Sequence, residues 1–468
     1  MDFFRLNRHL GRTTAQEQWH TGRRFWICRA VFAAAGICAA AAGVVAAPKI
    51  QVAPEACLLD AVVAISSSGL EPNKPVTIRA EMADKGGRVW RSHAVFVADG
   101  NGSVNLSSQA ATEGTYKGID AMGLIWSMQL DPATPAEQRD PFEVDLDKPM
   151  PAKFDLEVGG QKVDSCTLTR SARDSKVTVR EVKEDGLVGA LFMPAGKGPH
   201  PCMIVLSGSD GGVKRGDAGL LASHGFAAFS LAYFRAEGLP DNLVEIPLDY
   251  LKKGMDWLRK QEGVNGDQLG VIGSSRGGEL ALLLGAMFPE VRCVVAYVPS
   301  HVVWQGLSMT GPPPDATSWT YKGEKLPYLR GKPSPAFYAQ FSTPGNPMKL
   351  LDVFVPALED AEAVEKAAIA VERIKGPVLL VSGKDDDMWP SALMADKVVE
   401  RLKKHNHPFP YGHLSYAGAG HGIRKAYLPA AGTVSTPQFA LGGNEEANAK
   451  AQADSWPKVL KFLQQSLK

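Results

Sequence analysis

The feature that most restricts the fold of this chain is the alternation of apolar segments with helical stretches in its C-terminal two thirds. The segments 201–208, 268–275 and 376–383 are apolar almost throughout, and a helix is expected over 248–261. Strands buried on both faces read as continuous apolar runs, and their alternation with helices is typical of a mostly parallel sheet covered by helices. We therefore expect an α/β domain over residues 171–468.

Residues 47–170 have a different composition. Short β-prone segments such as 75–82 and 89–98 are separated by turn signals at 84–87 and 99–102. Short strands at this spacing, joined by glycine-containing turns, predict an all-β sandwich domain.

The first 46 residues are expected to be a signal peptide. Residues 1–30 hold six arginines against two acidic residues, and an uncharged run rich in alanine and glycine follows. This order indicates export, with cleavage after Ala46. The pair Arg23–Arg24 resembles a twin-arginine signal, so we expect a periplasmic protein. Two other interpretations stay open: an uncleaved membrane anchor over residues 30–47, and a leader that does not function, which would leave the protein in the cytoplasm.

Charge limits the kind of partner. The 468 residues include 51 basic and 50 acidic side chains, for a formal net charge of +1. This balance gives no electrostatic sign of a nucleic-acid partner, so we expect a small-molecule substrate. A membrane partner is expected only if the leader is uncleaved, and the sequence does not fix the oligomeric state.

Four cysteines follow the leader. Cys57 and Cys166 lie near the two ends of the predicted sandwich, and we hypothesise that they form a disulfide in an oxidising compartment. Cys202 and Cys293 lie in apolar strand-like runs, where a free thiol usually behaves as a small buried hydrophobe.

A possible nucleophile stands at the end of one apolar segment. The sequence Gly273-Ser274-Ser275-Arg276-Gly277 is the chain's one G-x-S-x-G motif, and it lies between an expected strand and an apolar helix. This is the context of a nucleophile elbow, in which the two glycines leave room for a tight turn that lifts the serine above the sheet. The motif is weak by itself, because ordinary glycine-rich loops also carry it.

An unactivated serine hydroxyl needs a base, and the base needs an acid that orients it. In the expected fold both follow the serine, each just after a strand. We choose Asp386 as the acid because it stands three residues after Gly383, the usual spacing, and we expect Asp385 and Asp387 to be solvated. We choose His421 as the base because it follows the last strand on a loop of small residues.

The other downstream histidines are expected to be structural or exposed. His405 and His407 lie in a polar stretch, and His413 is expected to precede the last strand.

Backbone N–H groups should stabilise the oxyanion. We expect one from Arg276, directly after the nucleophile, and one from Ser209 or Asp210 in the loop 207–212. A phosphate-binding interpretation of this glycine-rich loop is weaker, because the lysine and hydroxyl residues of a Walker motif are missing.

Residues 300–365 form an insertion that is rich in proline and aromatic residues and too long for a plain connection. Long insertions in compact domains are often lids or binding loops. An excursion that only packs on the surface is an equally good interpretation.

Together these segments resemble a known family. Residues 270–300, 376–391 and 416–423 look like the C-terminal domain of the acyl-CoA thioesterase and bile acid-CoA:amino acid N-acyltransferase family, and residues 75–106 with 118–129 look like its N-terminal domain. The resemblance implies an immunoglobulin-like β-sandwich followed by a dienelactone-hydrolase-like α/β-hydrolase domain. It also implies a triad carried by Ser275, Asp386 and His421.

In that family the N-acyltransferase branch uses cysteine and the thioesterases use serine, so the resemblance implies acyl-CoA thioester hydrolysis by water. No cofactor and no metal is expected, since no His, Asp or Glu cluster has ligand spacing. Because an exported enzyme would rarely meet acyl-CoA, two alternatives stay open: a carboxylesterase or amidase of the same fold, and a secreted binding protein whose hydrolase domain is silent.

Overall fold

The computed structural model describes residues 47–468 apart from 136–140, 313, 343–344 and 424–426. The predicted signal peptide, residues 1–46, therefore lies outside the described residues. The alternative membrane anchor, residues 30–47, also lies outside them except for Ala47.

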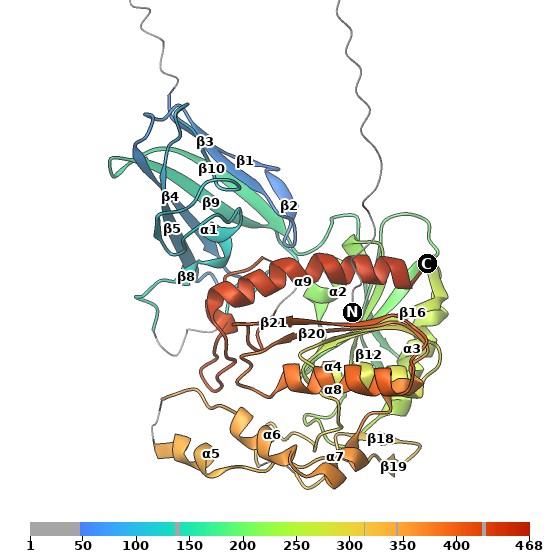
Figure 1. The fold of residues 1–468 in the computed structure, drawn as a ribbon. Helices are drawn as coiled ribbons and strands as arrows, with labels where there is room; N and C mark the ends of the chain where they lie inside the picture. Colours follow the sequence, from blue (N-terminus) through green and yellow to red (C-terminus); the bar gives the residue numbers. More distant parts are fainter. Residues whose placement is uncertain (1–46, 136–140, 313, 343–344, 424–426) are drawn as a thin grey trace, which may run out of the picture. The chain divides into compact units, whose positions relative to one another are not determined.

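Two sheets form the N-terminal domain (Figure 1), and their strands pair antiparallel except for the parallel pair β2–β10. The smaller has the order β1-β3-β6, and the larger has the order β2-β10-β9-β4-β5-β7, with β8 beside β5. The bounds are β1 Lys49–Ala53, β2 Ala56–Leu58, β3 Ala64–Ser68, β4 Pro75–Ala83, β5 Val89–Val97, β6 Val104–Asn105, β7 Glu113–Gly114, α1 Gly123–Trp126, β8 Gln129–Leu130, β9 Met150–Val158 and β10 Gln161–Ser171.

The sequence pattern explains how these sheets pack. Alternate residues of β4 and β5 are buried, as expected for strands with one face on a core and one in solvent. Ile78 of β4 and Phe96 of β5 share one hydrophobic core with Ile50 of β1 and Ile65 of β3. The predicted β-sandwich is therefore present.

The predicted disulfide is wrong in this structure, where Cys57 and Cys166 are both free. Strand β2 pairs with β10 in a register that sets Cys57 opposite Arg170, whereas Cys166 lies four residues earlier, opposite Phe154 of β9. Four residues of strand span about 13 Å, well beyond the 7 Å limit between the Cα atoms of a disulfide.

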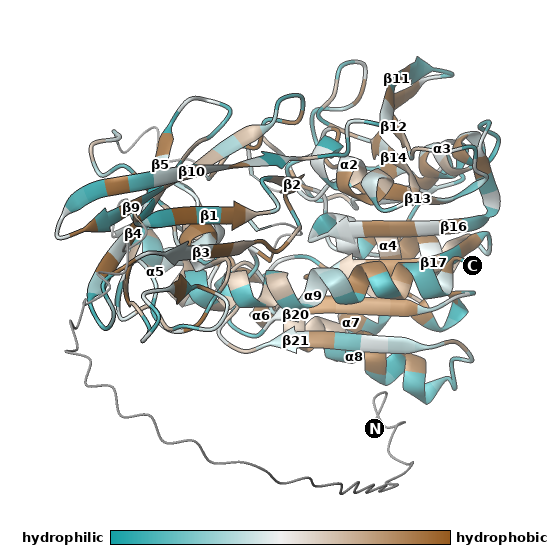
Figure 2. Ribbon diagram, turned by 90° about the horizontal axis from the view of Figure 1, so that it is seen from above, coloured by the Kyte–Doolittle hydropathy of each residue, from teal (hydrophilic) through white to brown (hydrophobic). Residues whose placement is uncertain are grey.

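The C-terminal domain is built on an eight-stranded sheet of order β11-β12-β14-β13-β16-β17-β20-β21. Strand β12 is antiparallel to both neighbours, and every pair from β14 to β21 is parallel. The bounds are β11 Thr178–Glu184, β12 Leu187–Met193, β13 His200–Leu206, β14 Ala227–Ala232, β16 Val264–Ser274, β17 Val291–Tyr297, β20 Val378–Gly383 and β21 Tyr411–Tyr416. This is the predicted α/β-hydrolase sheet, and Figure 2 shows β16, β17, β20 and β21 side by side.

Helices cover both faces of this sheet (Figure 1). One core joins Met203 of β13 and Val295 of β17 to α2 and α9, and the other joins Ile204 and Val294, from the opposite faces of the same strands, to α3, α4 and α8. The bounds are α2 Arg215–Ser223, α3 Leu248–Arg259, α4 Arg276–Met287, α8 Ser391–Lys404 and α9 Glu445–Ser466. Burial on both faces explains why these strands read as continuous apolar runs.

The remaining elements are short. Most belong to the insertion, where β18 and β19 form a small sheet with β15. The bounds are β15 Ile246–Pro247, β18 Trp319–Tyr321, β19 Glu324–Lys325, α5 Pro335–Ala339, η2 Gln340–Ser342, α6 Leu351–Ala357, α7 Ala361–Ala367, η3 Val371–Arg373 and η4 Ala431–Thr433.

Polar contacts join the two domains. Asp60 accepts hydrogen bonds from Nε2 of His224, at the end of α2, and from the indole N–H of Trp456 in α9, at 2.6 and 2.7 Å. The amide of Tyr427 donates to the carbonyl of Leu59 at 3.1 Å.

Candidate active site

Ser275 stands on a strained turn between β16 and α4. Its backbone has φ 58° and ψ −122°, a combination that a residue with a side chain rarely adopts. The turn is held on both sides, because its amide donates to the carbonyl of Tyr297 at 2.9 Å and its carbonyl accepts from the amide of Glu279 at 3.0 Å. Strain of this kind is characteristic of nucleophile elbows.

The two motif glycines are required by close backbone approaches. A Cβ atom at Gly273 would lie 2.1 Å from the carbonyl oxygen of Gly277, and one at Gly277 would lie 2.3 Å from the carbonyl oxygen of Ser207. The expectation that side chains at these positions would obstruct the turn is confirmed. The two glycines are therefore needed because α4 closely approaches β16 and the loop after β13.

The loop 207–212 lies directly against the serine. Gly208 to Gly211 form a turn closed by a 3.2 Å hydrogen bond, and a Cβ atom at Gly208 would be 3.6 Å from the Cβ of Ser275. Among the described residues, no acceptor takes the N–H of Ser209 or Asp210. The amide of Arg276 is the first of α4, so it has no partner in a preceding helical turn. The roles of Arg276, Ser209 and Asp210 as oxyanion donors stay predictions.

Asp386 and His421 meet as predicted. Nδ1 of His421 lies 2.8 Å from Oδ2 of Asp386 in a hydrogen bond, and the aspartate is 4% exposed. Because the carboxylate accepts at Nδ1, Nε2 of the imidazole is the nitrogen left to act as a base. Of the two neighbouring aspartates, Asp385 is exposed and Asp387 pairs with Lys349 at 3.0 Å.

The Asp386 carboxylate is held by more partners than the sequence suggested. Oδ1 accepts the amides of Met388 and Trp389 at 2.9 and 3.2 Å, and Oδ2 also accepts the hydroxyl of Ser391 at 2.6 Å. Four donors therefore surround the two oxygens. Ser391 was missed by sequence reasoning, because a serine at the first position of a helix normally signals only a helix start.

His421 is held by its backbone. Its amide donates to the carbonyl of Leu441 at 2.7 Å, and a Cβ atom at the preceding Gly420 would lie 2.2 Å from the carbonyl oxygen of Gly442. The loop of small residues that suggested His421 is thus needed for the close approach of residues 441–442.

We call Ser275, Asp386 and His421 the edge set, because each follows the C-terminal end of a parallel strand. Strands β16, β17, β20 and β21 are consecutive neighbours, so these ends lie along one edge of the sheet. Ligands of open α/β sheets bind at this edge. No hydrogen bond joins the Ser275 hydroxyl to His421 among the described contacts.

A second group of the same residue types joins strands β20 and β21 to helix α8. Nε2 of His413 is 2.6 Å from the hydroxyl of Ser382, and its Nδ1 is 2.9 Å from Oδ1 of Asp396. We call Ser382, His413 and Asp396 the strand set. Ser382 is fully buried in β20, and burial lowers the pKa of His413. His413 lies inside β21 and not before it, and its 7% exposed side chain is consistent with the expected structural role.

The remaining two histidines also match expectation. His405 is exposed at the end of α8, and His407 is buried with Nε2 3.1 Å from the carbonyl of Gly376.

The side chain of Arg276 has a role separate from its amide. It is buried and pairs with Glu279 at 2.6 Å, and its Nη2 donates to the carbonyl of Gln305 at 3.0 Å. Glu279 in turn accepts the indole N–H of Trp319 at 2.8 Å, and burial raises its pKa to about 7. The start of the insertion is therefore fastened to α4, directly after the nucleophile.

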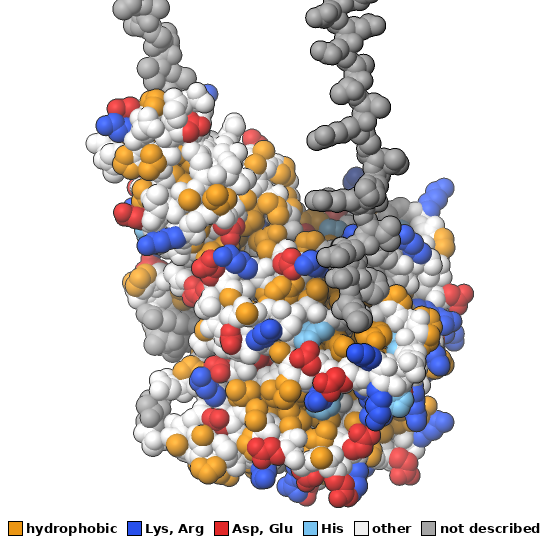
Figure 3. All heavy atoms as spheres, in the orientation of Figure 1, with side chains coloured by type: hydrophobic (Ala, Val, Ile, Leu, Met, Phe, Trp, Pro, Cys, Tyr) orange, Lys and Arg blue, Asp and Glu red, His pale blue; other side chains and the backbone are white. Residues whose placement is uncertain are grey.

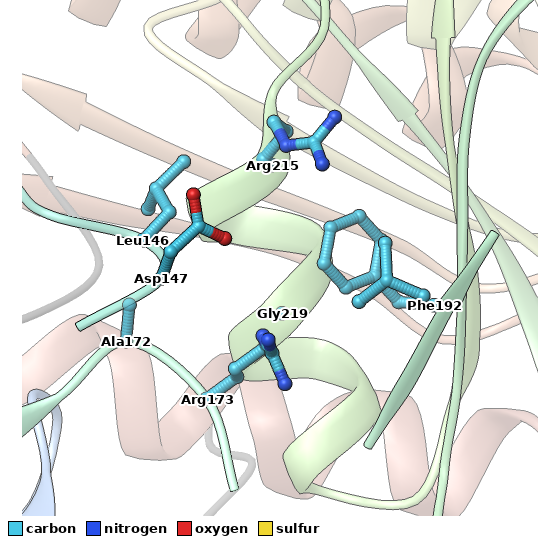
Figure 4. A pocket seen from close by; sticks show the side chains of 8 residues that line it. Leu146, Asp147, Ala172, Arg173, Phe192, Arg215 and Gly219 are labelled. Atoms are coloured by element: carbon cyan, nitrogen blue, oxygen red, sulfur yellow. The ribbon is translucent and has the colours of Figure 1, made fainter. Parts of the chain in front are cut away.

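A small pocket lies away from the edge set (Figure 4). Arg173, Arg215 and Asp147 surround it, with the ring of Phe192 on one side. Arg215 is paired with Glu181 at 2.6 Å. The pocket is lined by no residue of the edge set.

The face seen in Figure 3 intersperses basic and acidic side chains, in keeping with the near-zero net charge. Within the described part of the chain, no helix is long and apolar enough to cross a bilayer. In that same part, no three His, Cys, Asp or Glu residues cluster as metal ligands.

Comparisons with known proteins match both domains. The model described as "BAAT / Acyl-CoA thioester hydrolase C terminal" matches residues 246–468, and the one described as "Acyl-CoA thioester hydrolase/BAAT N-terminal region" matches residues 60–184. Mouse acyl-coenzyme A thioesterase 6 is 31% identical over 87% of this chain and 94% of its own length. Mouse bile acid-CoA:amino acid N-acyltransferase is 30% identical over 90% and 98%. Among solved structures, a dienelactone hydrolase described as putative, from Klebsiella pneumoniae, matches 62% of this chain and 99% of its own, at 17% identity and TM-score 0.39.

Proposed function

The chain belongs to the acyl-CoA thioester hydrolase and bile acid-CoA:amino acid N-acyltransferase family, and from this premise we propose that it hydrolyses acyl-CoA thioesters through Ser275, His421 and Asp386. It is an enzyme with a hydrolase fold, and its relatives include proteins named acyl-coenzyme A thioesterases. The small-molecule substrate that we propose is therefore an acyl thioester of coenzyme A.

One observation carries this proposal: the hydrogen-bonded pair of Asp386 and His421 lies at the same sheet edge as the strained turn of Ser275. The acid fixes which imidazole nitrogen holds the proton, and the turn presents the hydroxyl outside the sheet. Activating a serine requires a base and an acid that orients this base, and we assign these roles to His421 and Asp386.

In the proposed reaction, Ser275 Oγ attacks the thioester carbonyl while His421 Nε2 takes its proton. The N–H groups of Arg276 and of Ser209 or Asp210 stabilise the oxyanion. The C–S bond then breaks, the departing thiolate of coenzyme A takes the proton from His421, and an acyl-enzyme remains. Water attacks this ester with His421 again as the base, the bond to Oγ breaks, and Ser275 recovers its proton.

The leaving group affects how much acid catalysis the enzyme needs. A thiolate leaves without prior protonation, whereas an amine does not. A serine nucleophile also fits transfer to water, as the family resemblance implies. We also propose that the first 46 residues direct export. If the protein is exported, an ester or an amide outside the cytoplasm is the alternative substrate.

A substrate panel tests the proposal. Acyl-CoA, a p-nitrophenyl ester and a peptide amide would be given to the wild type, to Ser275→Ala and, as a matched control, to Ser382→Ala. We expect the wild type and the control to turn over acyl-CoA and Ser275→Ala to lose nearly all turnover while staying folded. Turnover retained by Ser275→Ala would contradict the assigned nucleophile.

The panel also separates the alternatives. Preference for the ester or the amide over acyl-CoA would replace the proposed substrate, and a folded wild type that turns over no member of the panel would favour the binding-protein interpretation. Fractionation of cells expressing the full chain, with mass spectrometry of its N-terminus, tests export. A mature N-terminus at Ala47 is expected in the periplasm, and an intact Met1 in the cytoplasm would contradict export.

A further inference from the structure

Trp389 lies among the elements that carry the edge set. Its amide donates to Oδ1 of Asp386 at 3.2 Å, and its indole N–H donates to the carbonyl of Val298 at 3.1 Å. Its ring meets the His421 imidazole in an edge contact, with centroids 5.9 Å apart at 75°. The side chain is 2% exposed, so the acid and the base share one rigid neighbour.

The Val298 contact leads on to the nucleophile. Val298 follows Tyr297, whose carbonyl accepts the amide of Ser275 at 2.9 Å. Val298 itself has φ 37° and donates its amide to the carbonyl of Val381 in β20 at 2.6 Å. The indole N–H of Trp389 therefore binds Val298, the residue next to Tyr297, whose carbonyl holds the Ser275 amide.

The insertion packs on the other side of Trp389. Phe354, a half-buried residue of α6, meets the Trp389 ring at 5.7 Å and 74°. It also meets the ring of Trp304 at 4.7 Å and 75°. Trp304 is fixed in turn, because its indole N–H donates to the hydroxyl of Ser300 at 2.8 Å.

Trp304 closes the path back to the nucleophile. Its amide donates to Oε1 of Glu279 at 3.4 Å, and the amide of Glu279 donates to the carbonyl of Ser275 at 3.0 Å. An unbroken series of contacts thus runs from the nucleophile through the insertion to the base, although the hydroxyl and the imidazole share no hydrogen bond of their own.

We propose that Trp389 is a positioning residue for His421, and that Phe354 of the insertion holds Trp389 against it. The inference rests on the proposed function, because it assigns His421 as the base. In this account the 300–365 insertion maintains the geometry of catalysis, in contrast to the lid and surface interpretations. The effect on rate arises because small displacements of a catalytic base are costly.

The insertion offers a matched control. Phe337 of α5 is also a half-buried phenylalanine, but its ring contacts are with Tyr338 and Phe341. Tyr338 and Phe341 are 61% and 60% exposed. Among the described residues, Phe337 has no ring contact with Trp389. Its removal changes the surface of the insertion without touching the series of contacts.

The test compares Phe354→Ala, Phe354→Leu and Phe337→Ala, with Ser275→Ala as the reference. Each full-length variant would be measured for kcat and KM with an acyl-CoA, for the rate at which a fluorophosphonate labels Ser275, and for its melting temperature. The labelling rate reports activation of the serine without the substrate's binding contacts. Trp389→Phe, which keeps a ring but removes the indole N–H, provides the same test if Phe354→Ala does not fold.

We expect Phe354→Ala to lower kcat and the labelling rate by about 10-fold or more while KM stays within about twofold. Phe354→Leu should restore most of the loss, and Phe337→Ala should match the wild type. Trp389→Phe should lower kcat with unchanged KM.

The proposal is overturned if folded Phe354→Ala keeps the wild-type kcat, if only its KM rises, or if Phe337→Ala loses as much. Turnover retained by Ser275→Ala would instead overturn the proposed function, so the two failures can be told apart.

Discussion

The edge set and the strand set contain the same three residue types in opposite circumstances. In the strand set, hydrogen bonds of 2.6 and 2.9 Å connect all three side chains, but Ser382 is fully buried inside β20. In the edge set only the acid and the base are bonded, yet Ser275 stands on a strained turn beside a loop with unused N–H groups. Hydrogen-bond connectivity alone therefore does not define a site. Access, backbone geometry and the neighbouring N–H groups of the loop 207–212 distinguish one set from the other.

The serines give the sharpest contrast. Ser275→Ala should lower kcat for acyl-CoA hydrolysis by roughly 10⁴-fold or more, because removing a triad nucleophile eliminates the covalent route. Ser382→Ala should leave kcat within about twofold and cost on the order of 1 kcal/mol of stability, because one buried hydrogen bond is lost. A thiol-reactive dye measures the released coenzyme A. Comparable losses of kcat in both variants would break the distinction.

The acids should differ nearly as much. Asp386→Asn should lower kcat by about 10⁴-fold, since an amide favours the wrong imidazole tautomer of His421. Asp396→Asn should change kcat by less than about twofold, because the side chain of Asp396 is 63% exposed and pairs with a histidine outside the proposed chemistry. Steady-state kinetics on both folded variants decides the matter. An Asp386→Asn enzyme with near-normal kcat would mean that His421 is oriented by another group.

Two glycines test the backbone part of the comparison. Gly277→Ala should lower kcat by about 10²-fold and destabilise the protein by about 1–3 kcal/mol, because its Cβ would lie 2.3 Å from the Ser207 carbonyl oxygen. Gly412, beside His413, should accept alanine, since that Cβ would be 3.8 Å from Leu379. Urea unfolding and kinetics would be run in parallel. If Gly412→Ala were the more damaging change, the elbow geometry would not be the critical element.

The smallest expected effect concerns pH and the strand set. Burial lowers the pKa of His413 from its ordinary value of 6.5, so the folded state binds this proton less readily than the unfolded state. Its contribution to stability is therefore complete above about pH 6.5 and is lost as the pH falls toward the folded-state pKa. Between pH 7.5 and pH 5.5 the free energy of unfolding should fall in both proteins, and the fall should be smaller in His413→Gln than in the wild type by on the order of 1 kcal/mol. Urea titrations at both pH values measure this, and equal losses would show that His413 does not titrate in this way.

Much of the fold and the edge set could be predicted because each rests on a local pattern. Apolar runs identify strands covered on both faces, and the spacing of Gly273 and Gly277 records a backbone contact. Asp386 and His421 follow strand ends, where the chemistry of this fold is placed. A local spacing also distinguishes Asp386 from the aspartates on either side of it, because Asp386 stands three residues after Gly383.

The rest depended on register and side-chain packing, which a single sequence does not encode locally. The disulfide was predicted wrongly because Cys57 and Cys166 both lie near ends of the domain in the sequence. The β2–β10 register instead sets Cys57 opposite Arg170. The strand set was not foreseen because Ser382 and His413 lie on neighbouring strands that are 31 residues apart in sequence. The packing of Phe354 on Trp389 is likewise a contact between distant segments, with no periodicity to reveal it.

Labelling of the folded wild type with a fluorophosphonate, followed by peptide mass spectrometry, tests the central claim most directly. The account predicts a single adduct on Ser275 and none on Ser382, with loss of acyl-CoA hydrolysis in proportion to labelling. An adduct on Ser382, or full activity in protein labelled at Ser275, would contradict it.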